Sequence, residues 1–501
     1  MDTNTNNQES VEPKENPLRA EKKRKLQELK DQGIDVYPHN FERTGQAEQI
    51  KSKFSHIEDG EKLNEEVYTI AGRLMTKRDM GKASFFNIQD QSGNIQVYLK
   101  TAALSEKDQL AFKGVDIGDI IGVKGFIFKT KKGELSVHAS EFNILCKTLE
   151  PLPEKFHGLT DVEAKYRHRH LDLIMNPDSR KVFEMRSKII REMRNYMDNK
   201  GFLEVETPVL QPIYGGAAAH PFSTHHRALD MKLFMKISPE LYLKRLTVGG
   251  FEKVYEIGKN FRNEGIDRSH NPEFTMMEYY EAYTDYNYQM EQFEDLVATV
   301  TKKVCGTTKI KYQGKDLDIT TPWRRLTVHD GIREYAKFDP DELSDDQLYA
   351  KIQELGYGGD RPASRGEMLM EAFDLKVEEH LWNPTFVIDH PVEISPLTKS
   401  HRIKEGLVER FEPVMAGMEL GNAYTELNDP EEQLARLEEQ ESKRLVDEEA
   451  QPMDRDFLHA IDVGMPPTGG VGIGVERLVM VLTDSHSIRD IIFFPTMKPK
   501  S

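Results

Sequence analysis

Three short segments of the chain share an alternating pattern that predicts β-strands with one chemically active face. They are residues 254–262, 274–280 and 422–426. Because side chains alternate along an extended strand, Glu256, Asn260 and Arg262 share one face of the first segment. The corresponding faces of the other two carry Phe274, Met276, Glu278 and Tyr280, and Asn422, Tyr424 and Glu426. Acids, an arginine and aromatic rings that converge on one pocket suit a ligand with both a cationic amine and a phosphate.

The bulk composition indicates a multidomain protein of a reducing compartment. At 501 residues with 38% hydrophobic content, the chain is long enough for two or more folded domains. It has no apolar stretch near the roughly 20 residues that a spanning helix needs, and its polar N-terminus resembles no secretory signal. Only Cys146 and Cys305 are present, too few for a disulfide framework or a zinc cluster. We therefore expect a cytoplasmic protein that does not enter a membrane.

The acidic charge is concentrated in the C-terminal two thirds of the chain. The formal net charge is -17, yet residues 1–150 hold 23 basic and 24 acidic side chains. An overall negative field argues against a protein that coats nucleic acid, while the balanced N-terminal third is able to meet a polyanion. The acidic remainder suits cations, including Mg²⁺, although a solvated acidic surface that confers solubility explains the charge equally well.

The N-terminal segment is predicted to be a polar tail followed by a basic helix. Residues 1–17 are polar and predicted to be disordered. Residues 18–32 have a helical pattern with four consecutive basic side chains at 22–25. This helix either touches a nucleic acid backbone or faces water.

Five short strands with Gly-bearing turns follow, a count that suits a small barrel of the oligonucleotide-binding (OB) kind. They are predicted at residues 67–74, 83–90, 95–99, 120–129 and 134–145. Such barrels present aromatic side chains on which bases stack. Phe85 and Phe86 are adjacent on one strand, so one should face the core and the other the outside. Residues 18–150 are therefore predicted to form one domain that binds nucleic acid.

The rest of the chain is predicted to be a connecting segment and one large domain. Residues 151–178 should form a linker and a connecting helix, because Thr160 and Glu163 make a capping-box pattern ahead of a helix that runs to about residue 174. Residues 179–501 are typical of a single domain of strands and helices, with a helical insertion near residues 325–380.

Three strings in the large domain carry a resemblance to a known family. They are GFLEVETP at 201–208, FRNEG at 261–265 with the downstream Phe274, and GIGVER at 472–477. An arginine on a strand suits a phosphate, because guanidinium binds oxyanions bidentately, and glycines let the backbone approach a ligand closely. Each string alone is weak, but their order resembles the three motifs of the class II aminoacyl-tRNA synthetases.

The N-terminal barrel narrows the resemblance to subclass IIb, whose members charge lysine, aspartate or asparagine. It implies an α+β fold, in which an OB-fold barrel binds the anticodon and a catalytic domain is built on an antiparallel sheet flanked by helices. A lysine side chain needs carboxylates around its ammonium, whereas an aspartate side chain needs an arginine. Glu240 in SPELYLKR stands where aspartate enzymes carry glutamine, with Ser238 predicted to cap its helix. Tyr424 and Glu426 in GNAYTELND also suit a cation.

The whole set resembles the lysyl-tRNA synthetase family, which implies ATP-dependent activation of L-lysine and its transfer to tRNA(Lys). By this resemblance, lysine would contact Gly216, Glu240, Arg262, Glu278, Tyr280, Asn422, Tyr424 and Glu426. ATP would contact Arg262, Glu264, His270, Phe274 and Arg477, and Mg²⁺ would be held by Glu412 and Glu419. Arg262 and Arg477 would act in catalysis, because arginines neutralise charge that spreads onto phosphate oxygens.

The resemblance also implies two kinds of partner. Phe85, Gln96 and Glu134 in the barrel would read the anticodon by stacking and by hydrogen bonds to base edges. The string GFLEVETP resembles the dimer-interface element of the family, which implies a homodimer.

Three positions depart from the family pattern. Glu476 stands where aspartate is more usual, Tyr424 where bacterial members often have phenylalanine, and His220 where arginine or lysine is usual. Glu476 preserves the negative charge of the usual residue, and Tyr424 preserves the aromatic ring. His220 puts one cationic contact in doubt and introduces a group that titrates near neutrality.

The sequence features also oppose three other interpretations. An aspartyl or asparaginyl synthetase is opposed by the acids of the pocket, and a lysyl transferase that acts on protein is opposed by the barrel. A non-catalytic RNA-binding or regulatory paralogue is opposed by the phosphate and metal ligands Arg262, Glu412, Glu419 and Arg477.

Overall fold

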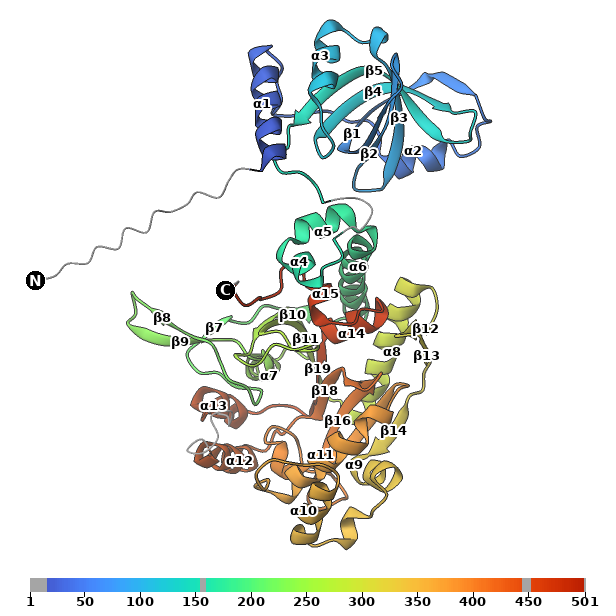
Figure 1. Ribbon diagram of the computed structural model, residues 1–501. Coiled ribbons are helices and arrows are strands. Elements are labelled where there is room, and N and C mark those ends of the chain that lie inside the picture. Colours follow the sequence, from blue (N-terminus) through green and yellow to red (C-terminus); the bar gives the residue numbers. More distant parts are fainter. Residues whose placement is uncertain (1–15, 154–158, 444–451, 500–501) are drawn as a thin grey trace, which may run out of the picture. The chain divides into compact units, whose positions relative to one another are not determined.

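The computed structural model describes residues 16–153, 159–443 and 452–499. The chain forms two compact units, which divide between Gly158 and Leu159 (Figure 1). The predicted disordered tail lies outside the described residues as far as residue 15. Asn16 already caps the first helix, because its side chain accepts a hydrogen bond from the backbone N–H of Leu18 at 2.9 Å. The helix therefore begins at Pro17, inside the segment predicted as tail.

The first unit contains three α-helices, one 3-10 turn and five strands among its described residues. The helical elements are α1 (Pro17–Asp31), α2 (Ala47–Lys53), η1 (Thr101–Ala103) and α3 (Glu106–Gly114). The strands are β1 (Lys62–Asp79), β2 (Ala83–Gln89), β3 (Asn94–Lys100), β4 (Ile120–Lys129) and β5 (Leu135–Cys146).

The five strands close into a barrel in the order β1-β2-β3-β5-β4, which confirms the predicted OB-type barrel. Alternation along β2 buries Phe86, which is 1% exposed, and leaves Phe85 half-buried on the outside. Helix α3 between β3 and β4 was not predicted. Its signal is Ser105, whose hydroxyl accepts a hydrogen bond from the Asp108 backbone N–H at 3.1 Å.

The described residues of the second unit hold a longer series of elements. The helices are α4 (Val162–Arg167), α5 (Arg169–Met175), α6 (Pro177–Asn199), α7 (Glu240–Val248), α8 (Tyr286–Cys305), α9 (Val328–Gly331), α10 (Asp345–Glu354), α11 (Arg365–Lys376), α12 (Pro430–Lys443), α13 (Arg455–Val463), α14 (Val475–Leu482) and α15 (Ile488–Ile491). Shorter helical turns are η2 (Ile332–Ala336), η3 (Pro340–Glu342), η4 (Glu378–His380) and η5 (Val392–Ile394). The strands are β6 (Leu203–Glu204), β7 (Leu210–Gln211), β8 (Ser223–His226), β9 (Met231–Met235), β10 (Lys253–Phe261), β11 (Glu273–Ala282), β12 (Lys309–Tyr312), β13 (Lys315–Asp318), β14 (Arg324–Thr327), β15 (Thr385–Pro391), β16 (Leu407–Met415), β17 (Met418–Glu419), β18 (Gly421–Thr425) and β19 (Thr468–Gly474).

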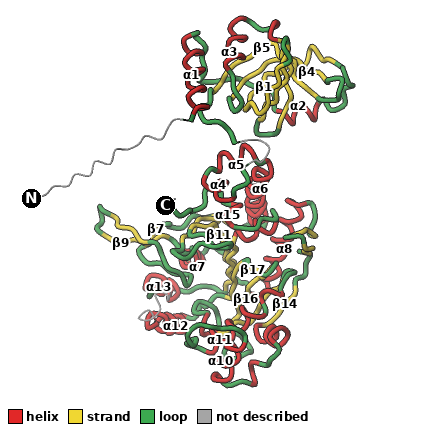
Figure 2. The backbone as a smooth tube through the Cα atoms, in the orientation of Figure 1, coloured by secondary structure: helices red, strands yellow, loops and turns green. Residues whose placement is uncertain are grey.

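A nine-stranded sheet forms the centre of this unit, in the order β14-β15-β16-β18-β19-β11-β10-β6 with β17 paired to β16 (Figures 1 and 2). Its central pairs are antiparallel as predicted, while the edge pairs β14–β15 and β10–β6 are parallel. One face packs on α6, α8 and α14 through a continuous apolar core. The opposite face of the central strands is not covered by these helices and lines a cavity.

The connecting helix was predicted wrongly in two respects. Its N-cap is Asp161 and not Thr160, because the Asp161 carboxylate accepts hydrogen bonds from the backbone N–H groups of residues 163 and 164. The helix also breaks at His168 into α4 and α5. There Arg169 turns inward, pairs with Asp172 at 2.6 Å and donates to carbonyls near the C-terminus. These contacts hold both helices within the second unit.

Helices α9, α10 and α11 and the short turns around them lie in the region where a helical insertion is predicted. This region has its own apolar core, which includes Ile332, Leu348 and Phe373. No helix in the described ranges is both long and apolar enough to cross a bilayer.

Candidate active site

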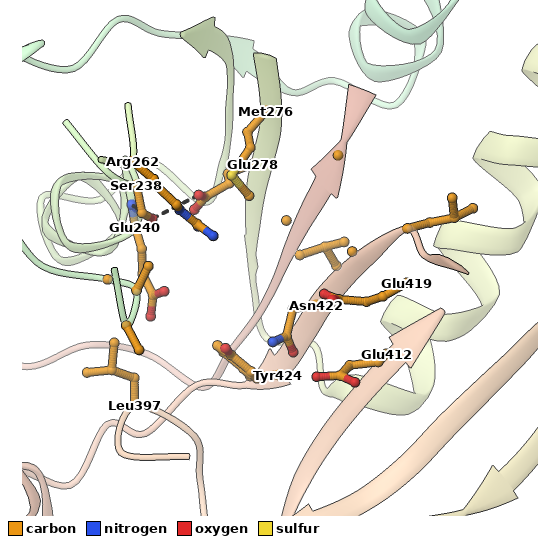
Figure 3. A pocket seen from close by; sticks show the side chains of 18 of the residues that line it. Ser238, Glu240, Arg262, Met276, Glu278, Leu397, Glu412, Glu419, Asn422 and Tyr424 are labelled. Carbon is orange, nitrogen blue, oxygen red and sulfur yellow. Dashed lines mark hydrogen bonds between the residues drawn. The ribbon is translucent and has the colours of Figure 1, made fainter. Parts of the chain in front are cut away.

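A cavity of about 660 Å³ lies on the face of the central strands opposite the packed helices. Alternation decides which residues line it: on β11, Met277 and Tyr279 enter the core, whereas Glu278 and Tyr280 face the cavity. The cavity is lined by all fourteen residues predicted for lysine, ATP and metal: Gly216, Glu240, Arg262, Glu264, His270, Phe274, Glu278, Tyr280, Glu412, Glu419, Asn422, Tyr424, Glu426 and Arg477. Figure 3 shows Glu240 and Glu278 on one side of it and Glu412 and Glu419 on the other.

Glycines of β19 form the floor of the cavity. Gly470 and Gly472 face it, while Val471 and Ile473 are buried in the core on the other side. The register sets Gly470 between Tyr280 and Tyr424, and Gly472 between the strands that carry Glu278 and Asn422. A Cβ at Gly470 would lie 2.0 Å from Glu426 Oε1 and 2.4 Å from the Tyr280 ring. Only a residue without a side chain leaves the acid and the ring where they are.

Three buried carboxylates gather at one end of the cavity. Glu240 begins α7, Glu278 lies on β11 and Glu426 follows β18, and they are 4%, 3% and 1% exposed. The Ser238 hydroxyl donates to Glu278 Oε1 at 2.8 Å and accepts from the Glu240 N–H at 3.1 Å (Figure 3). The predicted capping role of Ser238 is thus present, although the helix cap position itself is Pro239.

One cation in this group was not predicted. Lys244, fully buried on α7, pairs with Glu240 Oε1 at 2.7 Å and with Glu426 Oε2. Its i,i+4 spacing from Glu240 was a signal in the sequence. Its contact with Glu426 depends on two segments that only the fold brings together.

Burial and nearby negative charge raise the pKa of Glu278 and Glu426. Burial, together with the charge of Glu240, raises the pKa of Glu278 to about 8, although Ser238 and Tyr280 oppose the shift. Burial also raises the pKa of Glu426 to about 8, with Lys244 opposing and Glu240 and Glu278 adding to the rise. These carboxyl groups are therefore poised to exchange protons for another cation near neutral pH.

Arg262 lies between the acid group and Phe274. Its guanidinium carbon lies 5.2 Å from the centre of the Phe274 ring, and its charge acts to lower the pKa of Glu278. Among the described residues its buried Nε has no hydrogen-bond partner. Such an unsatisfied donor beside a cavity is typical of a group that completes its bonds with a ligand.

Arg477, at the start of α14, ties the predicted ATP residues together. It donates from NH1 to the Glu419 backbone carbonyl at 2.6 Å, and its NH2 lies 3.2 Å from His270 Nε2. His270 Nδ1 in turn lies 2.8 Å from Asp267 Oδ2. Glu264 belongs to the same exposed loop between β10 and β11.

Glu412 on β16 and Glu419 on β17 line the same side of the cavity (Figure 3). Despite burial, Arg410 at 2.5 Å and His390 hold the pKa of Glu412 well below its usual range. Burial and the charge of Glu412 raise the pKa of Glu419, which Arg477 opposes. Two carboxylates in a cavity large enough for phosphates fit Mg²⁺, because this ion is usually bound by one or two carboxylates together with substrate oxygens. Arg410, which also donates to Asn422 Oδ1 at 3.0 Å, was not predicted.

Two residues that depart from the family pattern have different surroundings. Glu476 lines the cavity and ties β11 to α6, because it accepts from the Thr275 N–H at 2.8 Å and pairs with Arg186 at 2.7 Å. His220 lines a separate cavity with Tyr214 and contributes its carbonyl to the Asn263 N–H at 2.7 Å. His220 therefore lies outside the main cavity, and the cationic contact that it was predicted to lack would belong to this second cavity.

The barrel presents a row of aromatic rings across four neighbouring strands. Phe85 lies 4.8 Å from Tyr98, Tyr98 lies 5.1 Å from His138, and His138 stacks on Phe126 at 4.6 Å, between ring centres. All four are half-buried on the outside of the barrel. Only Phe85 of the row was predicted, and alternation along β3 and β5 was the available signal for the others.

The other two predicted anticodon residues border this row. Gln96 Nε2 donates to Ser136 Oγ at 2.8 Å, and Glu134 is exposed just before β5.

The basic helix α1 uses several of its cations within the first unit. Lys22 is buried and donates to Thr148 Oγ1 at 2.8 Å, and Lys25 pairs with Asp116 at 2.6 Å. Arg24 pairs with acids on its own helix. These contacts favour packing within the first unit as the main role of Lys22 and Lys25, whereas Arg24 is exposed and paired within α1.

The barrel and the sheet with its acid-lined, arginine-bearing cavity define the architecture of a class II aminoacyl-tRNA synthetase. Residues 161–498 match the family described as tRNA synthetases class II (D, K and N), and residues 68–145 match the OB-fold nucleic acid binding domain. The chain belongs to the class II tRNA synthetase family.

Its curated relatives include enzymes named lysine–tRNA ligase. The chain is 53% identical to one from Methanoculleus marisnigri over 477 residues, which cover 95% of this chain and 94% of the relative. It is 50% identical to one from Clostridium botulinum over 506 residues, covering 100% and 99%, and 52% identical to one from Carboxydothermus hydrogenoformans over 478 residues, covering 95% and 97%.

Proposed function

We infer that this protein activates L-lysine with ATP and transfers it to the 3′ end of tRNA(Lys). The observation that carries the specificity is the buried group of Glu240, Glu278 and Glu426, three carboxylates for which the described residues supply one ion-paired cation, Lys244. An ammonium guest relieves this imbalance, whereas an aspartate side chain would bring a further buried negative charge. The full-length similarity to lysine–tRNA ligases supports the same specificity.

In this proposal lysine lies across the floor of β19. Glu240 binds its α-ammonium, while Glu278, Tyr280 and Glu426 receive the ε-ammonium. Asn422 and Arg262 orient its carboxylate, and Gly216 and Tyr424 complete the walls. Gly216 supports this arrangement, because it has a φ of +83° and a Cβ there would lie 2.8 Å from Glu240 Cβ.

Activation then needs positioning and charge neutralisation more than proton transfer. A lysine carboxylate oxygen attacks the α-phosphorus of ATP, and the bond from that phosphorus to the pyrophosphate oxygen breaks in line. Arg262 and Arg477 bind phosphate oxygens as negative charge spreads onto them, Phe274 stacks on the adenine, and Glu264 and His270 contact the nucleotide. The products are lysyl-adenylate and pyrophosphate.

Transfer completes the reaction. A terminal ribose hydroxyl of the tRNA, the 3′ one in class II behaviour, attacks the carbonyl carbon of the adenylate. The ester bond forms as AMP leaves, and the hydroxyl proton is lost. In the barrel, Phe85 stacks on an anticodon base, and Gln96 and Glu134 bond to base edges.

Glu412 and Glu419 would hold Mg²⁺ in this proposal. When bound, the ion would supply positive charge that offsets the negative charge of the ATP phosphates. Arg410 keeps Glu412 ionised for that purpose.

We also propose a homodimer. Leu203, Val209 and Leu210 are large apolar side chains that stay 42–48% exposed around β6 and β7, and β6 is an edge strand of the large sheet. Exposed apolar groups at an edge favour a second copy as their cover. Sedimentation velocity tests this state directly.

The function is tested by exchange of labelled pyrophosphate into ATP, with lysine, aspartate and asparagine in parallel. We expect exchange with lysine alone. Exchange that depends on aspartate or asparagine would replace the proposed specificity, and no exchange with any of the three would favour a non-catalytic RNA-binding or regulatory protein.

Lysine binding should depend on pH, because protons compete for the same carboxylates. Glu278 and Glu426 have pKa values of about 8 in the empty pocket, so below that pH they carry protons that the lysine ammonium must displace. We expect the KM for lysine to rise by at least about tenfold between pH 7.5 and pH 6.5 and to level off above pH 8. Glu278→Gln should flatten this dependence, and a KM that is constant over the range in the parent would contradict it.

The metal proposal predicts an altered Mg²⁺ requirement. Glu419→Gln removes one of two carboxylate ligands, so the Mg²⁺ concentration for half-maximal exchange should rise by about tenfold or more. Glu412→Gln should behave alike. Titrating Mg²⁺ at constant free ATP measures this, and an unchanged midpoint in both variants would remove these residues from the metal site.

A further inference from the structure

Lys244 stands behind the wall of the cavity and touches two of the acids that form it. Its side chain is 0% exposed and does not line the cavity, but it pairs with two residues that do: Glu240, one helical turn earlier on α7, and Glu426, which follows β18. Burial opposes its charge, but Glu240 and Glu426 outweigh that effect and raise the pKa of Lys244. The ammonium is therefore a fixed positive charge of the empty pocket.

We propose that Lys244 is a positioning residue for the amino-acid substrate, which favours the ionised form of Glu426 and aims Glu240 and Glu426 before lysine arrives. The inference rests on the proposed function, and it adds a residue that does not itself touch the substrate. The charges support it: three carboxylates face Lys244, Arg262 and the single net positive charge of bound lysine, so the occupied site is neutral.

The groups that face these charges come from several elements. The charged and titratable groups are Glu240 on α7, Glu278 and Tyr280 on β11, Tyr424 on β18, Glu426 after β18 and Arg262 after β10. The Phe457 ring on α13 also faces Lys244, with its centre 5.9 Å from Lys244 Nζ. Apolar packing by Phe457 and the absence of solvent at Lys244 keep the local dielectric low, so these charges act strongly on one another.

Whether Lys244 helps or hinders lysine binding depends on its distances from the carboxylates and from the substrate ammonium. Coulomb energy falls as the inverse of separation, and Lys244 touches Glu240 and Glu426, whereas a guest ammonium binds on their far side. Stabilising the carboxylates therefore outweighs repulsion of the guest. Without Lys244, the acids would keep their protons up to a higher pH, so lysine would have to displace them over a wider pH range.

A neighbouring buried lysine shows what a purely structural pair looks like. Lys236 is 1% exposed and pairs with Glu256, which also accepts from the Thr207 hydroxyl at 2.7 Å. Neither Lys236 nor Glu256 lines the cavity. Lys244 differs because both of its carboxylates do.

The test is the pH profile of the KM for lysine in pyrophosphate exchange, from pH 6.5 to pH 9. Lys244→Met keeps the length of the side chain and removes its charge. We expect its inflection to lie at least one pH unit above that of the parent, which raises the KM for lysine at pH 7 about tenfold while the KM for ATP changes less than about threefold. Lys244→Arg retains the charge and should keep the parental inflection.

Lys236→Met is the matched control, because it also removes a buried charge and should lower the melting temperature without moving the inflection. Lys244→Gln repeats the test with a side chain that still donates a hydrogen bond, in case the methionine variant does not fold. If Lys244→Met and Lys244→Gln keep the inflection pH of the parent, the inference about Lys244 is wrong and the proposed function is unaffected. A parent without lysine-dependent exchange would overturn the proposed function, and the inference with it.

Discussion

Replacing Arg262 by methionine is expected to lower the kcat of lysine-dependent pyrophosphate exchange by about 1,000-fold. The guanidinium lies between the acid group and Phe274, and its buried Nε has no hydrogen-bond partner among the described residues. It is therefore free to bind the reacting carboxylate and the phosphate, where charge develops. Single-turnover formation of lysyl-adenylate measures the loss.

A second variant separates charge from geometry. Arg262→Lys keeps the positive charge but not the planar fork that binds oxyanions bidentately, so its rate should lie between those of the parent and the methionine variant. Melting temperatures within a few degrees of the parent would show that both variants are folded. A methionine variant with a rate within tenfold of the parent would remove Arg262 from the reaction.

Gly470→Ala is expected to raise the KM for lysine by about 100-fold or more, because one added methyl group displaces two ligands of the proposed ammonium site. The new Cβ would lie 2.0 Å from Glu426 Oε1 and 2.4 Å from the Tyr280 ring, and both side chains are buried and held by neighbours. Neither can move away without breaking other contacts. The measurement is pyrophosphate exchange at varied lysine with saturating ATP.

Gly472→Ala is the comparison on the same face of the same strand. Its Cβ would meet Met276 Cε at 3.1 Å and Glu278 Cγ at 3.5 Å, of which the first is the flexible end of a side chain. We expect a smaller rise in the KM for lysine than at Gly470. Equal effects at the two positions would show that loss of backbone freedom in β19, and not the collision with Glu426, causes the defect.

Most of the candidate site was predictable because strand alternation sorts residues before any fold is known. The faces predicted for residues 274–280 and 422–426 line the cavity from β11 and β18. Of the face predicted for residues 254–262, only Arg262 lines it, whereas Glu256 pairs with Lys236 and Asn260 is buried outside the cavity. The barrel was predictable for the same reason, although α3 was missed and the connecting helix was placed one residue early. Local caps and breaks depend on single side-chain bonds, which a pattern over many residues does not specify.

The residues that prediction missed act through contacts between distant segments. Lys244 was visible as a helix neighbour of Glu240, but its pairing with Glu426 requires α7 to pack beside the end of β18. Arg410 likewise meets Asn422 only through the register of β16 and β18. No spacing within one segment signals such a pair.

The sequence by itself determined the chemical types at the site and the face of the strand or helix on which each stands, because side-chain direction follows from local backbone periodicity. It also determined family membership through its ordered motifs. The tertiary structure alone decided that Gly470 must lack a side chain, that Lys244 supplies the resident charge, and that burial raises the pKa of Glu278 and Glu426 to about 8. Collision, ion pairing and desolvation depend on distances across the fold, and those distances exist only after the strands have paired.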